Sequence, residues 1–494
     1  MPVPNHIVEN GPKTTAFGEM LVEMANPTIQ LDPVYGLRSK TDTNTLLDAS
    51  GSSAGASQQS NSNGTKEFKI TSGTAANTFA LLRSRKTVRY HPGQGMRFTF
   101  TGRFTSGVAG NTQRIGAYNY GNELAFGYNG TQFGILYRKG GLPEIRTLTV
   151  TVGAGGAENV TVKLNDVNTV VAVTAGTAAQ TASKLGVATY YGWEASSIGA
   201  TVVFVAKNDT AFSGAFSLTS TGVAAGTFAT TAAGITSTPT WIPQSQWNVD
   251  HCDGTGPSGF NLDPTKGNVF EIKSQYLGYG QVYFSVENEV GTFILVHKIN
   301  YPNQNATPLY SLPHFKAGMI SQNTTNTTAV SCYCASFAGF IDGKLVLLRD
   351  YSARSAAKAN IGTSSTPILS IRNKTVFNNT WNLNNIEINA VKGAIEGAKP
   401  GAIEVILNAV LTGAVWTAQD ATNSIVEYDT TATALSLGAN SQVLRTLPLA
   451  KSGAGIIDFK DAIQIIEAND TITIAAIASS TTIDAYVSIS WHED

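Results

Sequence analysis

Two glutamates near the middle of the chain have a spacing that could support acid–base chemistry. Glu287 and Glu289 are two positions apart, so a strand through both would carry the two carboxylates on one face. A pair of carboxylates is what glycoside hydrolysis requires. The surrounding residues, ENEVG, are typical of a hairpin tip, where charged side chains are solvated. We therefore predict that this pair is not catalytic, and we assign no catalytic residue.

Three aspartates upstream of this pair could supply oxygen ligands to a calcium ion. Asp250, Asp253 and Asp263 are closely spaced, and calcium prefers carboxylate oxygens. Their spacing does not match an EF-hand loop, and the terminal glutamate of such a loop is absent. Aspartates in loops commonly accept backbone N–H groups in Asx turns. We predict Asx turns and no cofactor, and these aspartates are weak candidates for a calcium site.

Two further motifs have a chemical interpretation that their context does not support. Gly254–Gly259, GTGPSG, matches a dinucleotide-binding pattern but lacks the strand before it and the helix after it, so it predicts a loop. Cys332 and Cys334 would face the same side of a strand, but no second ligand pair is available for zinc. We predict that both cysteines are buried as small hydrophobic residues.

A tyrosine-rich stretch, Gly116–Gly130, could form a surface on which sugar rings stack. Tyr118, Tyr120 and Tyr128 are the candidate glycan-binding residues. The alternative is that these aromatic rings fill the interior of a β-sandwich, where large rings bury the most apolar area. Both interpretations remain open at this point.

A local basic cluster, Arg83–Gly93 (RSRKTVRYHPG), has a functional and a simpler interpretation. It could contact an anionic glycan, lipid A or a partner subunit. The simpler expectation is a strand with a solvated basic face.

The composition favours an all-β chain. Charged residues make up 14% of the 494 residues, compared with about 25% in a typical globular chain. Long helices need charged exposed faces, whereas Gly-, Thr- and Asn-rich sequences suit short strands and tight turns. The net charge of −1 provides no basic field for a nucleic acid, so we expect no nucleic-acid partner. The chain contains no run of about 18 apolar residues, so no membrane span is predicted.

The three cysteines exclude a disulfide framework and imply folding in a reducing cytoplasm. The first residues, MPVPNHIVENGPKTT, lack the charged and apolar regions of a secretion signal, so no signal is expected.

Alternating apolar residues predict individual strands. Arg97–Phe104 alternates so that Phe98 and Phe100 share one face. Glu123–Gly140 predicts a hairpin around Asn-Gly, and Gln281–Ile299 predicts a second one.

The changes in composition along the chain predict four segments. These are an extended N-terminal arm and linker at 1–65, a jelly-roll-like (lectin-like) β-sandwich at 66–145 plus 239–364, an inserted small α+β module at 146–238, and a C-terminal β-sandwich at 365–494. Within the inserted module, Thr177–Tyr191 predicts one helix. A short helix is also expected within Ile456–Ile466, and Trp491 is expected in the core.

Several stretches resemble structural proteins of tailed bacteriophages, cyanophages and some large algal viruses. The stretches are Leu411–Thr417, Ser424–Leu435, Asp470–Asp494, Gln246–Glu287 and Thr161–Gly186. These stretches together make up less than a quarter of the chain, and their motifs carry no chemistry, so no binding or catalytic residues follow from the resemblance. It implies β-sandwich or jelly-roll domains, a homo-oligomer, and a position in the tail, baseplate, fibre or capsid surface of a virion.

Three classes of function therefore compete. The first is a structural virion protein that assembles with itself and other virion proteins, and this is the expectation we favour. The second is a module that recognises a host surface glycan, which is compatible with the first. The third is a polysaccharide depolymerase, which the missing carboxylate constellation disfavours.

Overall fold

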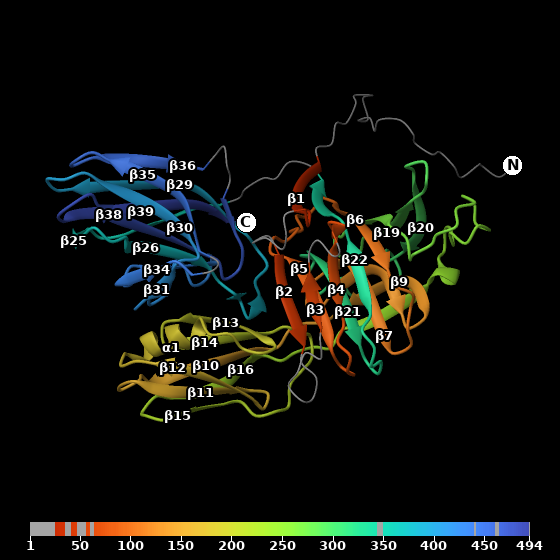
Figure 1. Cartoon of the computed structure of the whole chain (residues 1–494), viewed down its shortest axis with the longest axis horizontal. Helices are drawn as coiled ribbons and strands as arrows, with labels where there is room; N and C mark the ends of the chain where they lie inside the picture. Colours follow the sequence, from red (N-terminus) through yellow and green to blue (C-terminus); the bar gives the residue numbers. More distant parts are fainter. Residues whose placement is uncertain are drawn as a thin grey trace.

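The chain folds almost entirely into antiparallel strands, which form three β units (Figure 1). The computed structural model describes residues 25–34, 41–46, 56–59, 64–342, 349–438, 441–459 and 464–493. The large unit comprises the described residues up to 144 and residues 235–342. The inserted unit comprises residues 145–234, and the C-terminal unit comprises the described residues from 349 onward. The predicted class, all-β with jelly-roll or β-sandwich units, is confirmed.

The large unit contains two sheets. Along the first sheet lie β20 (Phe293–Ile299), β19 (Val282–Glu287), β18 (Asn268–Ser274), β6 (Met96–Phe104), β22 (Ser331–Cys334), β4 (Phe68–Thr71) and β3 (Ser57–Gln59), with β23 (Phe337–Asp342) and β1 (Ala25–Leu31) attached beside β6. Along the second lie β17 (Thr238–Pro243), β9 (Gln132–Lys139), β8 (Glu123–Asn129), β7 (Asn111–Tyr118), β21 (Lys316–Asn323), β5 (Phe79–Ser84) and β2 (Thr41–Leu46). A short 3₁₀ turn, η2 (Gln244–Gln246), follows β17.

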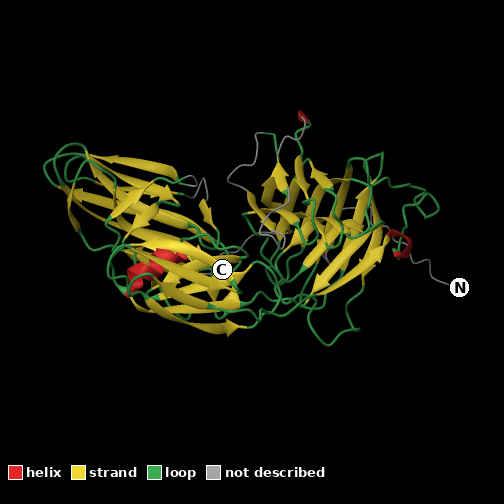
Figure 2. Cartoon of the chain, turned by 60° about the horizontal axis from the view of Figure 1, so that its bottom comes forward, coloured by secondary structure: helices red, strands yellow, loops and turns green. Residues whose placement is uncertain are grey.

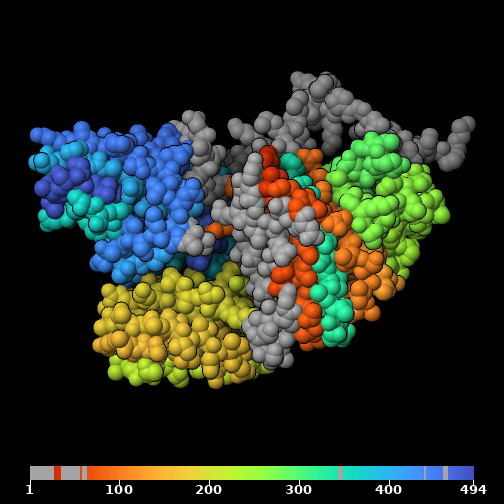
Figure 3. Space-filling view, in the orientation of Figure 1, coloured from red at the N-terminus to blue at the C-terminus, as the bar shows by residue number. Residues whose placement is uncertain are grey.

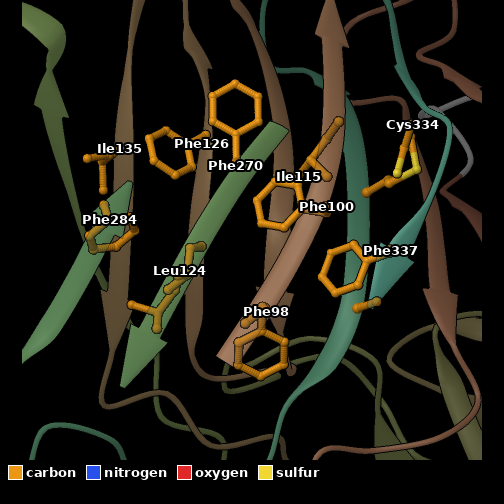
Figure 4. Packing of buried hydrophobic residues seen from close by; sticks show 14 of the residues in the cluster. Phe98, Phe100, Ile115, Leu124, Phe126, Ile135, Phe270, Phe284, Cys334 and Phe337 are labelled. Atoms are coloured by element: carbon orange, nitrogen blue, oxygen red, sulfur yellow. The ribbon is translucent and has the colours of Figure 1, made fainter. Parts of the chain in front are cut away.

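Phenylalanine rings fill the space between these two sheets (Figure 4). Every second residue of β6 is buried, as its alternating sequence predicts. The ring of Phe270 lies 5.8 Å from Phe100 and 4.6 Å from Phe126, which joins the two sheets. Each fully buried ring contributes about 1.5–3 kcal/mol relative to an exposed one.

Both predicted hairpins are confirmed. In β8–β9, Asn129 pairs with Gln132, and Gly130 occupies the first central position with φ +60°, which a II′ turn requires. In β19–β20, the N–H of Asn288 donates to the carbonyl of Thr292.

Within the extended arm and linker predicted over residues 1–65, the structure describes three strands, β1, β2 and β3. The first of them, β1, pairs with β23, and Ile29 and Leu31 enter the core. A proline lies on either side of these apolar residues, so the sequence did not indicate a strand there. In the structure, alternate residues of this strand face inward. Residues 1–24 of the predicted arm lie outside the described residues.

The inserted unit has its own apolar core between two sheets. One sheet contains β13 (Trp193–Ile198), β14 (Thr201–Ala206), β10 (Ile145–Val152) and β16 (Ala225–Ala232); the other contains β12 (Val167–Val173), β11 (Glu158–Leu164) and β15 (Ser217–Ser220). Its two ends lie side by side, because Leu142 and Ile235 exchange backbone hydrogen bonds of 2.9 Å in both directions.

The helix α1 (Ala178–Gly186) in this unit is the one α-helix of the described chain, marked red in Figure 2. A capping box between Thr177 and Gln180 starts it. It ends earlier than the predicted Tyr191. Gly186 lies so close to Ser197 that an added Cβ would be 2.7 Å from it, and Tyr190 then turns back to donate to the carbonyl of Leu185.

The C-terminal unit contains two larger sheets. The first has β24 (Arg349–Arg354), β25 (Lys358–Ile361), β39 (Ile483–Glu493), β29 (Ile386–Glu396), β36 (Ala454–Asp458) and β37 (Gln464–Ile466). The second has β32 (Thr417–Ala418), β33 (Val426–Asp429), β26 (Thr366–Asn373), β38 (Thr471–Ala478), β30 (Gly401–Leu407) and β35 (Gln442–Leu449). Two small ribbons are added by β27 (Val376–Phe377) with β28 (Thr380–Trp381), and by β31 (Val410–Thr412) with β34 (Ala434–Ser436).

Two sequence expectations concern the C-terminal unit. Trp491 is a fully buried core residue, as predicted. Of the segment Ile456–Ile466, in which a short helix is expected, residues 460–463 lie outside the described residues, so that expectation stays a prediction. Ile456–Asp458 belongs to β36 and Gln464–Ile466 to β37, and both strands pair with β29.

Candidate functional site

The candidate site is the junction where the three β units meet. All six residues of β5 are buried, because its inner face packs in the large unit's core and its outer face packs in the junction. An apolar cluster drawn from all three units fills the centre: Phe79, Leu81, Tyr118, Tyr120, Ile145, Val205, Ile320, Trp381 and Leu383.

Two of the three predicted glycan-stacking tyrosines lie inside this junction. Tyr118 is 6% exposed and Tyr120 is 1% exposed. The Tyr120 ring stacks on Trp381 of the C-terminal unit with ring centroids 4.3 Å apart. The assignment of these two tyrosines to an exposed sugar-stacking surface is therefore wrong, because other β units cover the face on which they lie.

Tyr128, the third candidate, lies away from the junction. It is half-buried and packs edge-on against Phe104 and Phe133, with centroid distances of 6.2 and 5.2 Å. Burial raises the pKa of its hydroxyl. Its role in glycan binding stays a prediction for a single half-buried ring.

A buried polar network ties the large unit to the inserted unit. Arg83 donates to the hydroxyl of Tyr120 at 2.6 Å and to Glu194 Oε1 at 2.5 Å. Tyr120 in turn donates to the same carboxylate oxygen at 2.8 Å. Burial raises the pKa of Tyr120 well above its usual value, so the hydroxyl remains a donor. These charge-assisted bonds fix the relative orientation of β5 and β13.

A second polar network ties the large unit to the C-terminal unit. Arg85 pairs with Asp470, and Lys316 donates to the carbonyl of Arg85. Thr87 Oγ1 donates to Glu467 Oε2 at 3.5 Å. Burial raises the pKa of Glu467 to about 7, and Lys316 opposes part of that shift.

These contacts show that the basic cluster Arg83–Gly93 is largely buried, so the expectation of a solvated basic face is wrong. Arg83 and Arg89 are each 6% exposed. Burial lowers the pKa of Arg89 to about 10, while Glu387 and Glu467 act to raise it. Burial also lowers the pKa of the adjacent His91 to about 4, with a further contribution from Arg89.

A third set of contacts joins the inserted unit to the C-terminal unit. Arg372 donates to the carbonyl of Ser197 and pairs with Glu427. Its guanidinium lies 4.3 Å from the centroid of the Trp416 ring, in a cation–π arrangement. The N–H of Gly199 donates to the carbonyl of Trp416 at 3.0 Å.

Two cavities lie next to these contacts. One, of about 490 Å³, lies at the junction beside Arg83, Arg85 and Asp470. The other, of about 950 Å³, lies between the inserted and C-terminal units, along the boundary of the yellow and blue regions in Figure 3. Glu194 and Lys207 line both cavities, so the two are neighbours.

The three aspartates proposed as weak calcium ligands each cap a turn. Asp250 accepts the N–H groups of Cys252 and Ser258, each at 2.8 Å. Burial acts to raise the pKa of Asp250, but these hydrogen bonds lower it overall.

Asp253 and Asp263 accept the hydroxyl and N–H of Thr255 and Thr265 respectively, and these bonds lower both pKa values. Within the described chain, no three His, Cys, Asp or Glu side chains are grouped so that they could hold a metal. The predicted Asx turns are confirmed.

The remaining sequence candidates are also placed. Glu287 ends β19 and Glu289 lies exposed in the following turn, so the two carboxylates do not share a strand face. Cys332 and Cys334 are buried, as predicted, and burial raises both thiol pKa values. Gly254–Gly259 forms a loop, as predicted.

Sequence reasoning missed Glu194, Trp381, Glu467 and Asp470. Trp381 gave the one usable signal, since a large aromatic residue inside the polar stretch NNTWNLNN needs a partner surface. The acidic residues gave none, because their basic partners are remote in the sequence.

The comparison with known proteins finds solved structures that superpose loosely on this chain, but no relative in sequence. No family model matches the chain, and no curated protein matches it. A peanut lectin solved with a nine-residue peptide is 11% identical; the match covers 62% of this chain and 99% of the lectin, with a TM-score of 0.22. Arcelin-5, a lectin-like defense protein from Phaseolus vulgaris, is 8% identical, with 65% and 99% covered and a TM-score of 0.22.

A triple jelly-roll protein from the turret of an archaeal virus is 7% identical, with 80% and 90% covered and a TM-score of 0.14. Superpositions this loose support no inference about function. In the described part of the chain, no helix has the length and apolar character needed to cross a membrane.

Proposed function

We propose that this chain is a non-enzymatic structural protein of a virus particle, and that the particle is a tailed bacteriophage. The observation that carries the proposal is the junction, in which partly buried ion pairs and stacked rings join three β units. Such a body keeps its binding surfaces in fixed relative positions, which assembly requires. The resemblance of the C-terminal and middle stretches to phage structural proteins supplies the virion context.

The proposed mechanism is assembly through many subunit contacts. Sheet edges, such as those of β12 and β36, offer backbone groups to a neighbouring chain. Copies of the chain associate with each other and with other virion proteins in the tail, baseplate, fibre or capsid surface.

Immunogold electron microscopy of purified particles tests this proposal. An antibody against the C-terminal unit is expected to label intact particles. Label at a tail tip or at vertices favours host attachment, and label over the shell favours decoration. Unlabelled particles, with the protein free in the lysate, would contradict a structural role.

We also predict that the chain forms a homo-oligomer. Light scattering coupled to size-exclusion chromatography at micromolar concentration should give a multiple of the 52.0 kDa chain mass. A monodisperse monomer would contradict the prediction.

A second function, recognition of a host surface glycan, is compatible with the first. The specific observation in its favour is the cavity of about 950 Å³ between the inserted and C-terminal units. Small-molecule sites commonly lie at such domain interfaces.

A further inference from the structure

The cavity between the inserted and C-terminal units is an open groove built by two β units. We name it the interunit groove. Its inserted-unit wall is formed by α1 and Val187–Tyr190, and its C-terminal wall by Ala409–Trp416 with Thr431 and Thr433. Figure 1 places β31 and β34 beside α1 and β13 at this boundary. Its volume of about 950 Å³ lies near the upper end of the usual range for ligand sites, about 300–1,000 Å³.

Hydroxyl groups without protein partners line both walls. Among the described residues, the side chains of Ser183, Thr189 and Thr412 make no hydrogen bond to the protein, and neither does that of Thr174. A hydroxyl both donates and accepts, so these groups match the alternating donors and acceptors of a polyhydroxylated ligand.

Apolar side chains lie among these hydroxyls. Val187 is 70% exposed and Val410 is 51% exposed, one on each wall of the interunit groove. The C–H faces of sugar rings pack against apolar groups, while their hydroxyls bond at the ring edges. This mixture of polar and apolar lining fits a sugar better than a purely apolar or purely ionic ligand.

The charges in the interunit groove favour an acidic ligand. The four charged lining residues are Lys184, Glu194, Lys207 and Arg372. Glu194 is paired with Arg83, and Arg372 is paired with Glu427. In the described structure, neither lysine has an ion-pair partner, so the interunit groove carries two unneutralised positive charges. A carboxylate on the ligand would neutralise them.

We propose that the interunit groove binds an oligosaccharide that carries carboxylate groups. This inference rests on the glycan-recognition function proposed above and names its site and ligand class. Lys184 and Lys207 hold the carboxylates, the free hydroxyls bond the sugar hydroxyls, and Val187 and Val410 pack on the ring faces.

The test is binding of the full chain to a panel of oligosaccharides, with microarray detection followed by calorimetry. The panel contains oligomers of galacturonate, guluronate and glucuronate, sialylated oligosaccharides, and a neutral counterpart of each. We expect binding to carboxylated members, weaker binding at high salt, and little binding to the neutral counterparts. The double variant Lys184→Ala/Lys207→Ala should weaken binding about tenfold or more, as two partly screened charge pairs are lost.

Two matched controls separate the interunit groove from general effects. Lys163→Ala removes a lysine of the inserted unit that does not line the interunit groove, and it should leave binding unchanged. Thr412→Trp places a large ring inside the interunit groove and should abolish binding, while Val223→Trp, at a 58% exposed position elsewhere on the inserted unit, should not.

Several results would overturn the inference: no binding to any carboxylated member, equal binding to the neutral counterparts, or binding that survives Thr412→Trp. Each leaves the structural proposal standing, because immunogold labelling of particles does not depend on glycan binding. If particles were unlabelled and the chain bound carboxylated oligosaccharides strongly, the proposed structural role would be rejected and the proposed binding site would stand.

Discussion

The Arg83 guanidinium shows how one side chain can join two β units. Its side chain is 8% exposed, and it donates to Tyr120 in its own unit and to Glu194 in the inserted unit. A buried pair of this kind adds less net stability than its Coulomb energy implies, since both charges were solvated in the unfolded chain. Removing Arg83 is costly, because the Glu194 carboxylate, whose side chain is 21% exposed, stays partly buried without this cationic partner.

Arg83→Met should therefore lower the free energy of unfolding by about 2–4 kcal/mol. Urea unfolding monitored by tryptophan fluorescence would measure it. The control is Lys266→Met, which breaks a surface pair in which the lysine is 79% exposed, and it should change stability by less than about 0.5 kcal/mol. Equal effects of the two substitutions would show that the Arg83 network does not hold the junction.

Glu467 should give the junction a pH dependence that Glu467→Gln removes. Burial raises its folded pKa to about 7 from an ordinary 4.5, so the folded protein binds this proton more tightly than the unfolded chain does. Its contribution is fully present below pH about 4.5 and is lost as pH rises through about 7. The stability of the wild type relative to Glu467→Gln should fall across this window.

Denaturation at several pH values measures this difference. Burial lowers the pKa values of His91 and His314, to about 4 and about 3, which gives a slope of opposite sign in the same region. Both proteins carry these histidines, so their effect cancels in the difference. A difference that does not vary between pH 4.5 and 7 would contradict a raised pKa at Glu467.

Among the elements, β12 is an edge strand with an unusual sequence. It pairs with β11 on one side, and its residues, VNTVVAV, contain no charge and no proline. Val170 is 61% exposed on it. Natural edge strands are commonly protected by charges or prolines. An uncharged edge therefore pairs either with a strand of a specific partner or with other copies of the chain in an aggregate.

Val170→Lys should therefore reduce self-association of the isolated chain. Turbidity during slow heating should rise later than for the wild type, because a lysine on an edge opposes strand addition. Val223→Lys, at a 58% exposed position between β15 and β16, is the control for added charge alone. An equal delay in both variants would mean that net charge, and not the β12 edge, controls association.

At the scale of the whole molecule, contacts in the junction hold together three units that have separate cores. The inserted unit leaves and re-enters the large unit at Leu142 and Ile235, which form a hydrogen-bonded antiparallel pair. This geometry allows a unit to be inserted into a hairpin without disturbing the pairing of β9 with β17.

Replacing residues 143–234 by Asn-Gly should therefore leave the remaining chain folded, since a two-residue turn can close such a pair. Circular dichroism should keep its β character, and unfolding should stay cooperative. The thermal midpoint should fall, because the contacts of Arg83 with Glu194 are lost. Loss of cooperative unfolding would show that the large unit depends on the inserted unit for its fold.

Local periodicity made several features predictable from the sequence. Alternation places Phe98 and Phe100 in the core, the Asn-Gly dipeptide marks the turn between β8 and β9, and the helix predicted from Thr177 contains α1. Each of these depends on residues close together in the chain. The strand β1 was not predictable, because its pairing partner, β23, lies far along the sequence.

The sequence by itself thus determined the all-β class, the hairpins and the buried cysteines. Only the tertiary structure decided that Arg83–Gly93 lies at the junction of the three β units and that Tyr118 and Tyr120 are buried in that junction. It also decided that two units enclose a groove. The physical reason is distance in sequence: Arg85 and Asp470 form one ion pair although 385 positions separate them. Local patterns carry no information on which surfaces will meet.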